Sequence, residues 1–597
     1  MSYENKHLIN QQSIAVLPFV NMSNDINNEY FCDGITEEII NALTKISQLK
    51  VIARTSSFAF KGKDIDIRKI GEQLNVHTIL EGSIKKSQDR IRITAQLIDI
   101  KDGTHYWSKK FDRELIDIFD LEDEISLTIA DEVRNNFGHF EIQDQLITQP
   151  TNNIDAYQMF LKGRSLQLKW TPDSINQAIV CYDQAVALDK NYAKAYYAKL
   201  QCYGLLGMWG YMPYEEAIGL AISNLLIAKE IDTSLPEYPL SFVGKFFWEE
   251  WDFKNAYIHI NKVLEINPKH IDGLEAMTEL FIALGFFDHA KIYANKLLEV
   301  DPLSANNHYT IAHIYYYQRQ YNKALECINY ALTLNPGLEL AHHLKCFCLI
   351  NLNKKQQFSK FIDKSSLIEE KNLLFNLVNN EGVEVPNHLI KKWSEISKNE
   401  AMLVPYDLFI LSNSNHKKLA FSSLSEMVKH RRGQVINYRQ EPFLQPLHNM
   451  QGFKDLHHSS LQLSEVKLSQ ENTEKTTSAI LNEIQIETLK DELLLYFKEE
   501  EPFLNPQLNL KLVAEILESN TNKISYLINK AFSLNFNDFV NSYRLDYFKT
   551  IAVDPKNSHL TILGLAYDSG FNSKSVFNTY FKKIENVTPR AWMKANM

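Results

Sequence analysis

The chain has 597 residues, a length that favours three or four domains over one core. Its hydrophobic fraction of 45% and charged fraction of 23% are ordinary for globular protein and exclude a fibrous or wholly disordered chain. Its net charge of −10 at pH 7 argues against a protein that binds nucleic acid over its whole surface.

The six cysteines form no Cys-x-x-Cys pair and no spaced set with histidines, so we expect neither a metal site nor a cofactor. Residues 1–12 lack the apolar core of a signal segment. No run of about eighteen apolar residues occurs either. These features predict a cytoplasmic protein that does not contact the membrane.

Residues 13 to about 137 carry the alternating patterns of an α/β domain. The stretch SIAVLPFV is expected to form a strand, and residues 37–46 have helical spacing. Residues 76–115 alternate apolar and polar positions over three strands, with turns at 87–89 and 102–103. A helix over residues 120–136 is expected to close the unit.

This segment resembles the TolB amino-terminal-domain-like module, which precedes helical repeats in many bacterial regulators and cyclases. The resemblance is carried by IAVLPFVNMS, YFCDGITEEIINAL, VIARTSSFAFKGK and EGSIKKSQDRIRITAQLIDIKDGTHYWSKKFDREL, and it implies a domain at residues 1–140 without settled chemistry. Ser56, Ser57 and Lys61 lack a phosphate-binding GxxxxGK[ST] loop, so we expect no enzyme. Gly34 could begin a ligand-binding helix, but we favour a simple turn.

Prolines and alanines recur with a period of 34 residues in the middle of the chain. The prolines are Pro268, Pro302 and Pro336, and the alanines, twelve residues before each, are Ala256, Ala290 and Ala324. This period is typical of tetratricopeptide repeats, in which small residues lie where paired helices cross. We expect a solenoid over residues 150–460 whose inner surface binds a protein or peptide partner.

Two groups in this region could form binding sites, but we favour structural roles for both. Aromatic residues at helical spacing usually pack between helices rather than line a groove. They are Phe246, Phe247, Trp248, Trp251, Tyr315, Tyr316 and Tyr317. The pairs His342-His343 and Cys346-x-Cys348 converge poorly on a helix, which argues against a metal. Residues 461–480 are polar and are predicted to form a flexible linker.

The tail, residues 481–597, differs from the rest in charge. From Pro502 onward it has 11 Lys and Arg against 7 Asp and Glu, which leaves 52 basic and 66 acidic residues before it. A basic tail on an acidic body is compatible with a DNA-binding end.

The tail contains two helix–turn–helix patterns. In the second, TILGLAYDSGFNSKSVFNTYFKK, Thr561 is expected to cap a helix and Gly570 to form the turn. The next helix, residues 573–583, is expected to bury Val576, Phe577, Tyr580 and Phe581. Its polar, acid-free face suits a DNA major groove. In the first pattern, LKLVAEILESNTNKISYLINKAF, the second helix is expected to bury Ile524, Leu527 and Ile528.

The two patterns resemble the AraC-type DNA-binding domain, most specifically in YRLDYFKTI, AYDSGFNSKSVFNTYFKK and TPRAW. The resemblance implies two recognition helices in successive major grooves. Glu518 and Asn586 stand where glycine is usual, and Tyr526 and Thr579 replace a common arginine. The candidates for base contact are Asn522, Lys523, Ser525, Tyr526, Asn529, Ser573, Lys574, Asn578 and Thr579. The candidates for phosphate contact are Lys530, Arg544, Lys582, Lys583 and Arg590, and the alternative for Arg544 is an ion pair with Asp538 or Asp546.

The predicted fold class is a multidomain α+β chain with an α/β N-terminal domain, an α-solenoid of tetratricopeptide repeats and an all-α double helix–turn–helix C-terminal domain. We expect a bacterial, sequence-specific transcription regulator that binds double-stranded DNA, and pairing into a homodimer is compatible with the sequence. The alternative is a scaffold or peptide receptor whose tail does not bind DNA specifically.

Overall fold

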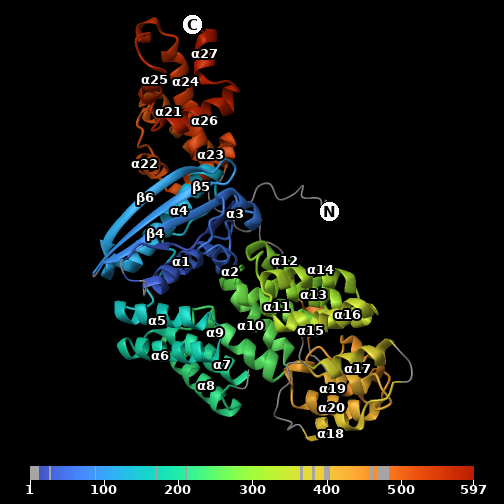
Figure 1. Ribbon diagram of the computed structural model, residues 1–597. Helices are drawn as coiled ribbons and strands as arrows, with labels where there is room; N and C mark the ends of the chain where they lie inside the picture. The colour runs from blue at the N-terminus through green and yellow to red at the C-terminus, as the bar shows by residue number, and fades with distance from the viewer. Residues whose placement is uncertain are drawn as a thin grey trace.

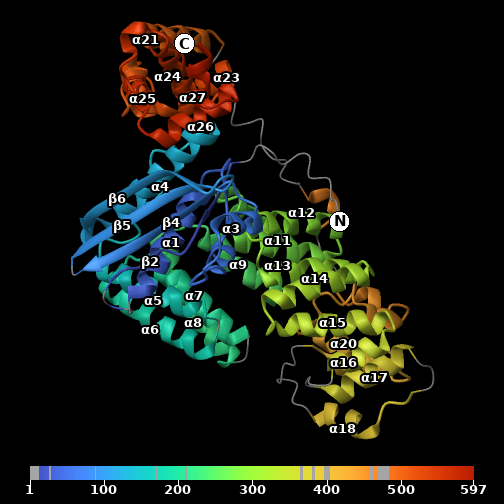
Figure 2. The same ribbon diagram turned by 45° about the horizontal axis from the view of Figure 1, so that its top comes forward.

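The protein has three parts in the computed structural model: an α/β domain, a helical solenoid and a helical C-terminal unit (Figure 1). The described residues are 12–23, 25, 28–87, 89–169, 171–208, 211–362, 367–379, 383–395, 404–457, 461–466 and 483–596. Both ribbon views place the α/β domain between the other two parts (Figures 1 and 2). The predicted fold class is therefore confirmed.

The α/β domain is built on one mixed sheet with the strand order β3-β1-β4-β5-β6, in which β2 also pairs with β4. The strands are β1 (Ser13–Val16), β2 (Val20–Asn21), β3 (Lys50–Val51), β4 (Thr78–Ser87), β5 (Arg90–Asp99) and β6 (Thr104–Glu114). β1 runs parallel to β3 and β4, whereas β4, β5 and β6 form the predicted antiparallel meander. Gly103, with φ of 72°, forms the turn between β5 and β6. Gln88, predicted in the other turn, lies outside the described residues.

Helices pack on this sheet and close the domain. They are α1 (Glu29–Thr44), α2 (Arg54–Phe58), α3 (Ile67–Leu74) and α4 (Ile118–Phe137). Helix α1 begins eight residues before the predicted start, so the prediction of a turn at Gly34 was wrong. A Cβ on Gly34 would lie 2.8 Å from a methyl carbon of Leu161. Glycine is used here because helix α5 (Ile154–Gln167) approaches α1 closely.

The solenoid consists of paired helices, and the 34-residue period corresponds to one pair. The regular helices are α10 (Phe253–Ile266), α11 (Ile271–Leu284), α12 (Phe287–Val300), α13 (Ala305–Tyr317), α14 (Tyr321–Leu334) and α15 (Glu339–Asn351). Among them, α11 packs most extensively on α12, and α13 on α14. Ala256, Ala290 and Ala324 are fully buried. The remaining helices are α6 (Pro172–Leu188), α7 (Ala193–Met208), α8 (Tyr214–Ile231), α9 (Glu237–Val243), α16 (Lys355–Ile362), α17 (Ile368–Asn379), α18 (Asn387–Glu395), α19 (Tyr406–Ser412) and α20 (Lys417–Lys429).

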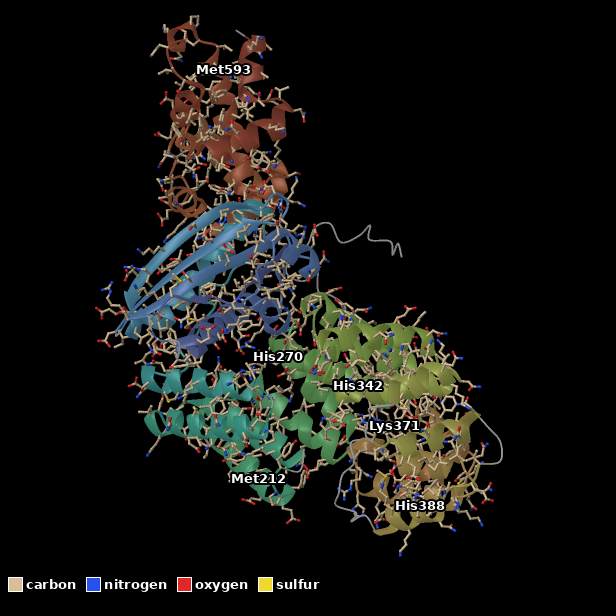
Figure 3. The ribbon with its side chains drawn as sticks, viewed as in Figure 1. Met212, His270, His342, Lys371, His388 and Met593 are labelled. Atoms are coloured by element: carbon tan, nitrogen blue, oxygen red, sulfur yellow. The ribbon has the colours of Figure 1, made fainter. Side chains whose placement is uncertain are left out.

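Most of the aromatic residues singled out in the repeats are core residues. Phe247, Trp251, Tyr316 and Tyr317 are buried, whereas Trp248 is 37% exposed. His343 also has a structural role. It is buried, and its Nδ1 lies within hydrogen-bond distance, 2.9 Å, of the buried Tyr406 hydroxyl. Its neighbour His342 is labelled on the solenoid in Figure 3.

The predicted linker at residues 461–480 begins too early. Leu461 is buried in the solenoid core, and Glu465 forms an ion pair of 2.6 Å with Lys254 on α10. Residues 461–466 therefore pack on the solenoid, and the rest of the predicted linker lies outside the described residues. Among the described helices, we find none with the length and apolar character needed to cross a membrane.

The C-terminal unit contains seven α-helices in its described residues and two small cores. The helices are α21 (Glu483–Glu499), α22 (Leu510–Ile516), α23 (Thr521–Phe532), α24 (Phe536–Ala552), α25 (Ile562–Asp568), α26 (Lys574–Glu585) and α27 (Pro589–Asn596). The α22–α23 pair belongs to one core and the α25–α26 pair to the other. Helix α24 contributes Phe539 to the first core and Phe548 to the second, so it fixes the two helix pairs relative to each other.

Candidate nucleic-acid interface

The second helix pair, α25 and α26, has the predicted caps and turn. Thr561 Oγ1 accepts a hydrogen bond of 3.0 Å from Gly564 N, and Ser573 Oγ accepts one of 3.2 Å from Val576 N. Gly570 has φ of 87°, and a Cβ there would lie 2.1 Å from the carbonyl oxygen of Phe503. Only glycine fits, because the backbone conformation and the close approach both exclude a side chain.

Helix α26 presents a polar outer face, with one correction to the prediction. Phe577, Tyr580 and Phe581 are buried, but Val576 is 36% exposed, so its predicted place in the core was wrong. Adjacent helical residues point about 100° apart, and the three aromatic rings already fill the side that faces the core. The exposed polar residues of α26 are Lys574, Ser575, Asn578, Thr579, Lys582 and Lys583, and the capping residue Ser573 is half-buried.

Contacts with α24 hold α26 in place. Lys583 forms an ion pair of 2.8 Å with Asp538, and the Tyr580 hydroxyl donates to the Asp538 carbonyl at 3.1 Å. Lys549 pairs with Glu585, the single acidic residue of α26. Lys583, a predicted phosphate contact, thus has an ion-pair partner within the domain, although its side chain is 57% exposed. Lys530, Lys582 and Arg590 are also exposed.

Arg544 was predicted to contact phosphate or to pair with Asp538 or Asp546, and the structure contradicts both. Its guanidinium is buried and donates to the carbonyl oxygens of Phe503 at 2.8 Å and Asn505 at 2.9 Å. Burial lowers the pKa of Arg544 to about 10. This residue therefore stabilises the fold of the C-terminal unit rather than facing a ligand.

Helix α23, in the first pair, also follows the predicted pattern. Asn520 caps it by accepting a hydrogen bond of 2.9 Å from Lys523 N, and Ile524, Leu527 and Ile528 are buried. Glu518 in the preceding turn has φ of 47°, the left-handed conformation that glycine would adopt more easily. Ser525, predicted to face outward, is only 7% exposed, because it lies at the edge of the apolar stripe one turn before Ile528.

Part of the outward face of α23 contacts the α/β domain: Asn522, Lys523 and Tyr526 are half-buried, whereas Asn529 is exposed. Asn522 accepts hydrogen bonds from Arg134 and from Ile142 N, and the Tyr526 ring lies edge-on to His139 with centroids 5.5 Å apart. Burial, together with Arg134, lowers the pKa of His139 to about 4, so its ring is neutral at pH 7. No local pattern in the sequence pointed to Arg134 or His139, because their partners lie almost 400 residues away.

Of the three residues weighed for catalysis in the α/β domain, Ser56 and Lys61 have structural partners, whereas the buried Ser57 hydroxyl has none among the described residues. Ser56 Oγ lies 2.5 Å from an Asp301 carboxylate oxygen, Ser57 is buried, and Lys61 pairs with Glu29 and Asp33. Within the described part of the chain, no group of three or more His, Cys, Asp and Glu side chains is placed to hold a metal ion.

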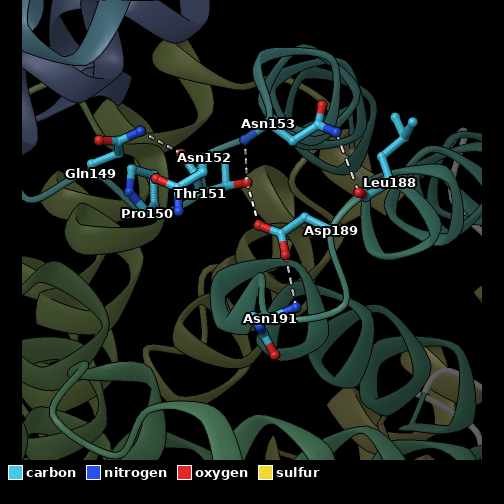
Figure 4. Close-up of a pocket in the computed structure, with 8 residues that line it drawn as sticks. All are labelled: Gln149, Pro150, Thr151, Asn152, Asn153, Leu188, Asp189 and Asn191. Atoms are coloured by element: carbon cyan, nitrogen blue, oxygen red, sulfur yellow. Dashed lines mark hydrogen bonds between the residues drawn. The ribbon is translucent and has the colours of Figure 1, made fainter.

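A pocket lies between the segment that precedes α5 and the turn that joins α6 to α7 (Figure 4). Its lining residues are Gln149, Pro150, Thr151, Asn152, Asn153, Leu188, Asp189 and Asn191. The Thr151 hydroxyl donates to Asp189, and Asp189 also accepts from Asn191 N at 2.9 Å. These polar atoms bind one another and hold the turns together.

Comparisons with known proteins match each of the three parts. Residues 513–595 match a helix-turn-helix domain, and residues 10–127 match the second domain of the HilA/YgeH-like transcriptional regulators. Residues 283–364 match subunit 3 of the anaphase-promoting complex, or cyclosome. The C-terminal unit is thus an AraC-type helix-turn-helix domain, and the middle of the chain is a tetratricopeptide-type solenoid.

A curated relative from Rhizobium meliloti (strain 1021), named putative adenylate cyclase 3, is 42% identical over 184 residues. The match covers 31% of each protein, so the chain spans about a third of that relative's length.

Similar solved structures include tetratricopeptide proteins. YrrB, a TPR protein with an unusual peptide-binding site, is 21% identical, with 32% of this chain and 92% of YrrB covered and a TM-score of 0.22. The human IFIT1 dimer with m7Gppp-AAAA is 13% identical, with 57% and 74% covered and a TM-score of 0.32.

Proposed function

We propose that this protein is a sequence-specific DNA-binding transcription regulator with the solenoid and the α/β domain as its input parts. The helix-turn-helix and regulator-type domain matches support a regulator. The observation that carries the proposal is the outer face of α26, which is exposed, polar and free of acid up to Glu585. A rigidly held helix with such a face suits a major groove.

The outer residues of α26 divide into two chemical roles. The amide of Asn578 can donate to adenine N7 and accept from adenine N6, and the Thr579 methyl can contact a thymine methyl. Ser573 and Lys574, at the start of the helix, complete the proposed base-reading set. Lys582, with Lys530 and Arg590, supplies exposed positive charge for phosphates.

The solenoid is proposed to bind the regulatory partner, a protein or peptide. Stacked helix pairs leave an extended concave surface, which is the feature that repeat proteins use for recognition. Pull-down with residues 150–460 should recover this partner, whereas equal recovery by the C-terminal unit alone would contradict the assignment. Sedimentation of the full chain would show whether two copies pair.

We further propose that the chain acts without catalysis, because Ser56 and Lys61 already have structural partners. Since one relative is named a putative adenylate cyclase, the direct test is an assay for cyclic AMP formation from ATP. Turnover by the purified chain would contradict this part of the proposal.

The alternative is a scaffold or peptide receptor without specific DNA binding, and the covered face of α23 is the observation that favours it. Selection of duplexes from a random pool, by the full chain and by residues 481–597 in parallel, separates the two functions. A regulator should enrich a motif with two half-sites about 10 base pairs apart. Enrichment of no sequence by either protein would support the scaffold.

A further inference from the structure

Two predicted base-contact residues of α23, Asn522 and Tyr526, lie partly under the α/β domain, and a third, the exposed Asn529, lies at the edge of this contact. Asn522, Tyr526 and Asn529 are spaced i, i+4 and i+7, so they form one stripe along the helix. The end of α4 and the segment after it, residues 134–142, lie against this stripe, and we call this segment the cover. Figure 1 shows the C-terminal unit seated on the end of the α/β domain away from the solenoid.

The cover makes the same two hydrogen bonds with the side-chain amide of Asn522 that an adenine would make. The Asn522 Nδ2 donates to the carbonyl oxygen of Ile142 at 3.0 Å, and its Oδ1 accepts from Ile142 N at 3.2 Å. An adenine edge offers the same pair, an acceptor at N7 and a donor at N6. Arg134 adds a hydrogen bond of 2.5 Å to the same Oδ1. The side-chain amide therefore cannot read a base while it binds Ile142.

Further contacts extend the cover along α23 and into α24. His139 packs edge-on against Tyr526, and Gly138 lies beside Asn529, whose Nδ2 is 3.5 Å from the Cβ position of the glycine. The main-chain carbonyl of Asn136 accepts a hydrogen bond from Asn535 at 2.9 Å, and its side-chain oxygen accepts one from Asn537 at 3.0 Å. A major groove has to surround the recognition helix, and the cover occupies that space.

The contact also has features of an interface that can open. Arg134 Nε and both ring nitrogens of His139 are buried without a hydrogen-bond partner. Such atoms lose their hydrogen bonds to water without gaining any to protein, so the interface is weaker than one in which every buried polar atom has a hydrogen-bond partner. The outer face of α26, by contrast, is exposed in the same structure.

We propose that this arrangement is a closed form in which the α/β domain masks the first recognition helix, so that α26 alone can read DNA until the cover leaves α23. The inference rests on the proposed DNA-binding function. The α/β domain is held on its other side by the solenoid, through Asp301 to Ser56 and through Lys269 to the Ser47 and Leu49 carbonyls. His270, beside Lys269, is labelled at this boundary in Figure 3. These contacts join the solenoid to the domain that carries the cover.

The test uses the full chain with Asn136→Ala and His139→Ala combined, and His105→Ala, an exposed histidine on β6, as the matched control. The first probe is the duplex that residues 481–597 enrich from the random pool, because both recognition helices are uncovered there. The second probe is a copy in which the α23 half-site, whose recognition is insensitive to Asn578→Ala, is scrambled. The wild-type chain and the control should bind the two duplexes within about twofold of each other. The double variant should bind the intact duplex about tenfold more tightly and the scrambled copy unchanged, because the lost contacts with Asn537 and Tyr526 weaken the hold of the cover on α24 and α23.

Equal affinity of wild type and double variant for the intact duplex would overturn the masking inference and leave the proposed function in place. Absence of specific binding by every variant and by residues 481–597 would overturn both. Asn537→Ala removes one of the same hydrogen bonds from the α24 side and should shift affinity in the same direction. Hydrogen exchange gives a second readout: the intact duplex should raise exchange at residues 136–142 and lower it at residues 521–532. Unchanged exchange at residues 136–142 in the DNA complex would contradict the inference.

Discussion

The Asp301 carboxylate accepts two hydrogen bonds from Ser56, at 3.0 Å from its backbone nitrogen and at 2.5 Å from its hydroxyl. Asp301 follows helix α12 of the solenoid and Ser56 lies on α2, so this pair joins the solenoid to the α/β domain. Asp301 is only 2% exposed. Burial raises its pKa to about 6, although the Ser56 hydrogen bonds act in the opposite direction.

This pKa predicts a pH dependence of stability. The folded-state pKa of about 6 lies above the value of 3.8 for a free aspartate. The stabilisation that Asp301 contributes to the folded state is therefore present below about pH 4 and is lost as pH rises through 6. The loss is on the order of 3 kcal/mol in the free energy of unfolding. Asp301→Asn keeps an acceptor but cannot ionise, so its thermal midpoint should fall less between pH 4 and 7. If the thermal midpoints of the variant and the wild type changed equally with pH, Asp301 would not be the source of this pH dependence.

Gly570→Ala should destabilise the C-terminal unit by at least about 3 kcal/mol, because it combines a left-handed backbone with a backbone clash. The added Cβ would lie 2.1 Å from the Phe503 oxygen. Gly219→Ala, inside α8 and with no atom within 4 Å of the new Cβ, is the control and should be neutral or stabilising. Urea unfolding of both variants decides the point, and similar midpoints would show that the turn tolerates a side chain.

Glu518→Gly should stabilise the same unit by about 1 kcal/mol, because Glu518 has φ of 47°. The matched control is Glu515→Gly, three residues earlier and inside α22, which should destabilise by about 1 kcal/mol. In thermal unfolding, the midpoint should therefore rise for Glu518→Gly and fall for Glu515→Gly. A loss of stability in both variants would mean that Glu518 serves some other purpose in the turn.

Arg544→Met should cost about 2–4 kcal/mol of stability, because the carbonyls of Phe503 and Asn505 would be left buried without donors. Its DNA affinity per folded molecule should keep the wild-type salt dependence. Arg590→Met, at an exposed position, should show the reverse: little change in stability and a salt slope lower by about one ion. A lower salt slope for Arg544→Met would restore the phosphate role rejected above.

Asn578→Ala should cost about 1–3 kcal/mol on the best duplex and relax preference at one or two positions. Lys582→Ala should weaken binding to all sequences alike and lower the salt slope by about one ion. Affinities for matched and mismatched duplexes at several salt concentrations distinguish these effects. Uniform loss for Asn578→Ala with altered preference for Lys582→Ala would mean that the two roles are exchanged.

Local regularities in the sequence were enough to determine the three kinds of fold. The recurrence of Ala256, Ala290 and Ala324 predicted the helix pairs, since only a small residue fits where two helices cross. The cap at Thr561 and the turn at Gly570 were predicted because each depends on the chemistry of one residue and its near neighbours. The stripe of Ile524, Leu527 and Ile528 likewise showed which side of α23 faces its own core.

Only the tertiary structure decided which part of the protein, or solvent, lies against the polar outer face of each helix. A polar stripe such as Asn522, Tyr526 and Asn529 suits water, DNA or another domain equally well, and nothing within α23 distinguishes them. The contact of Asn522 with Ile142 joins residues 380 positions apart. Arg544 appeared as a surface charge because its partners are backbone carbonyls, which every residue has. Amphipathic spacing reports the direction of burial, whereas the identity of the neighbour depends on how the whole chain packs.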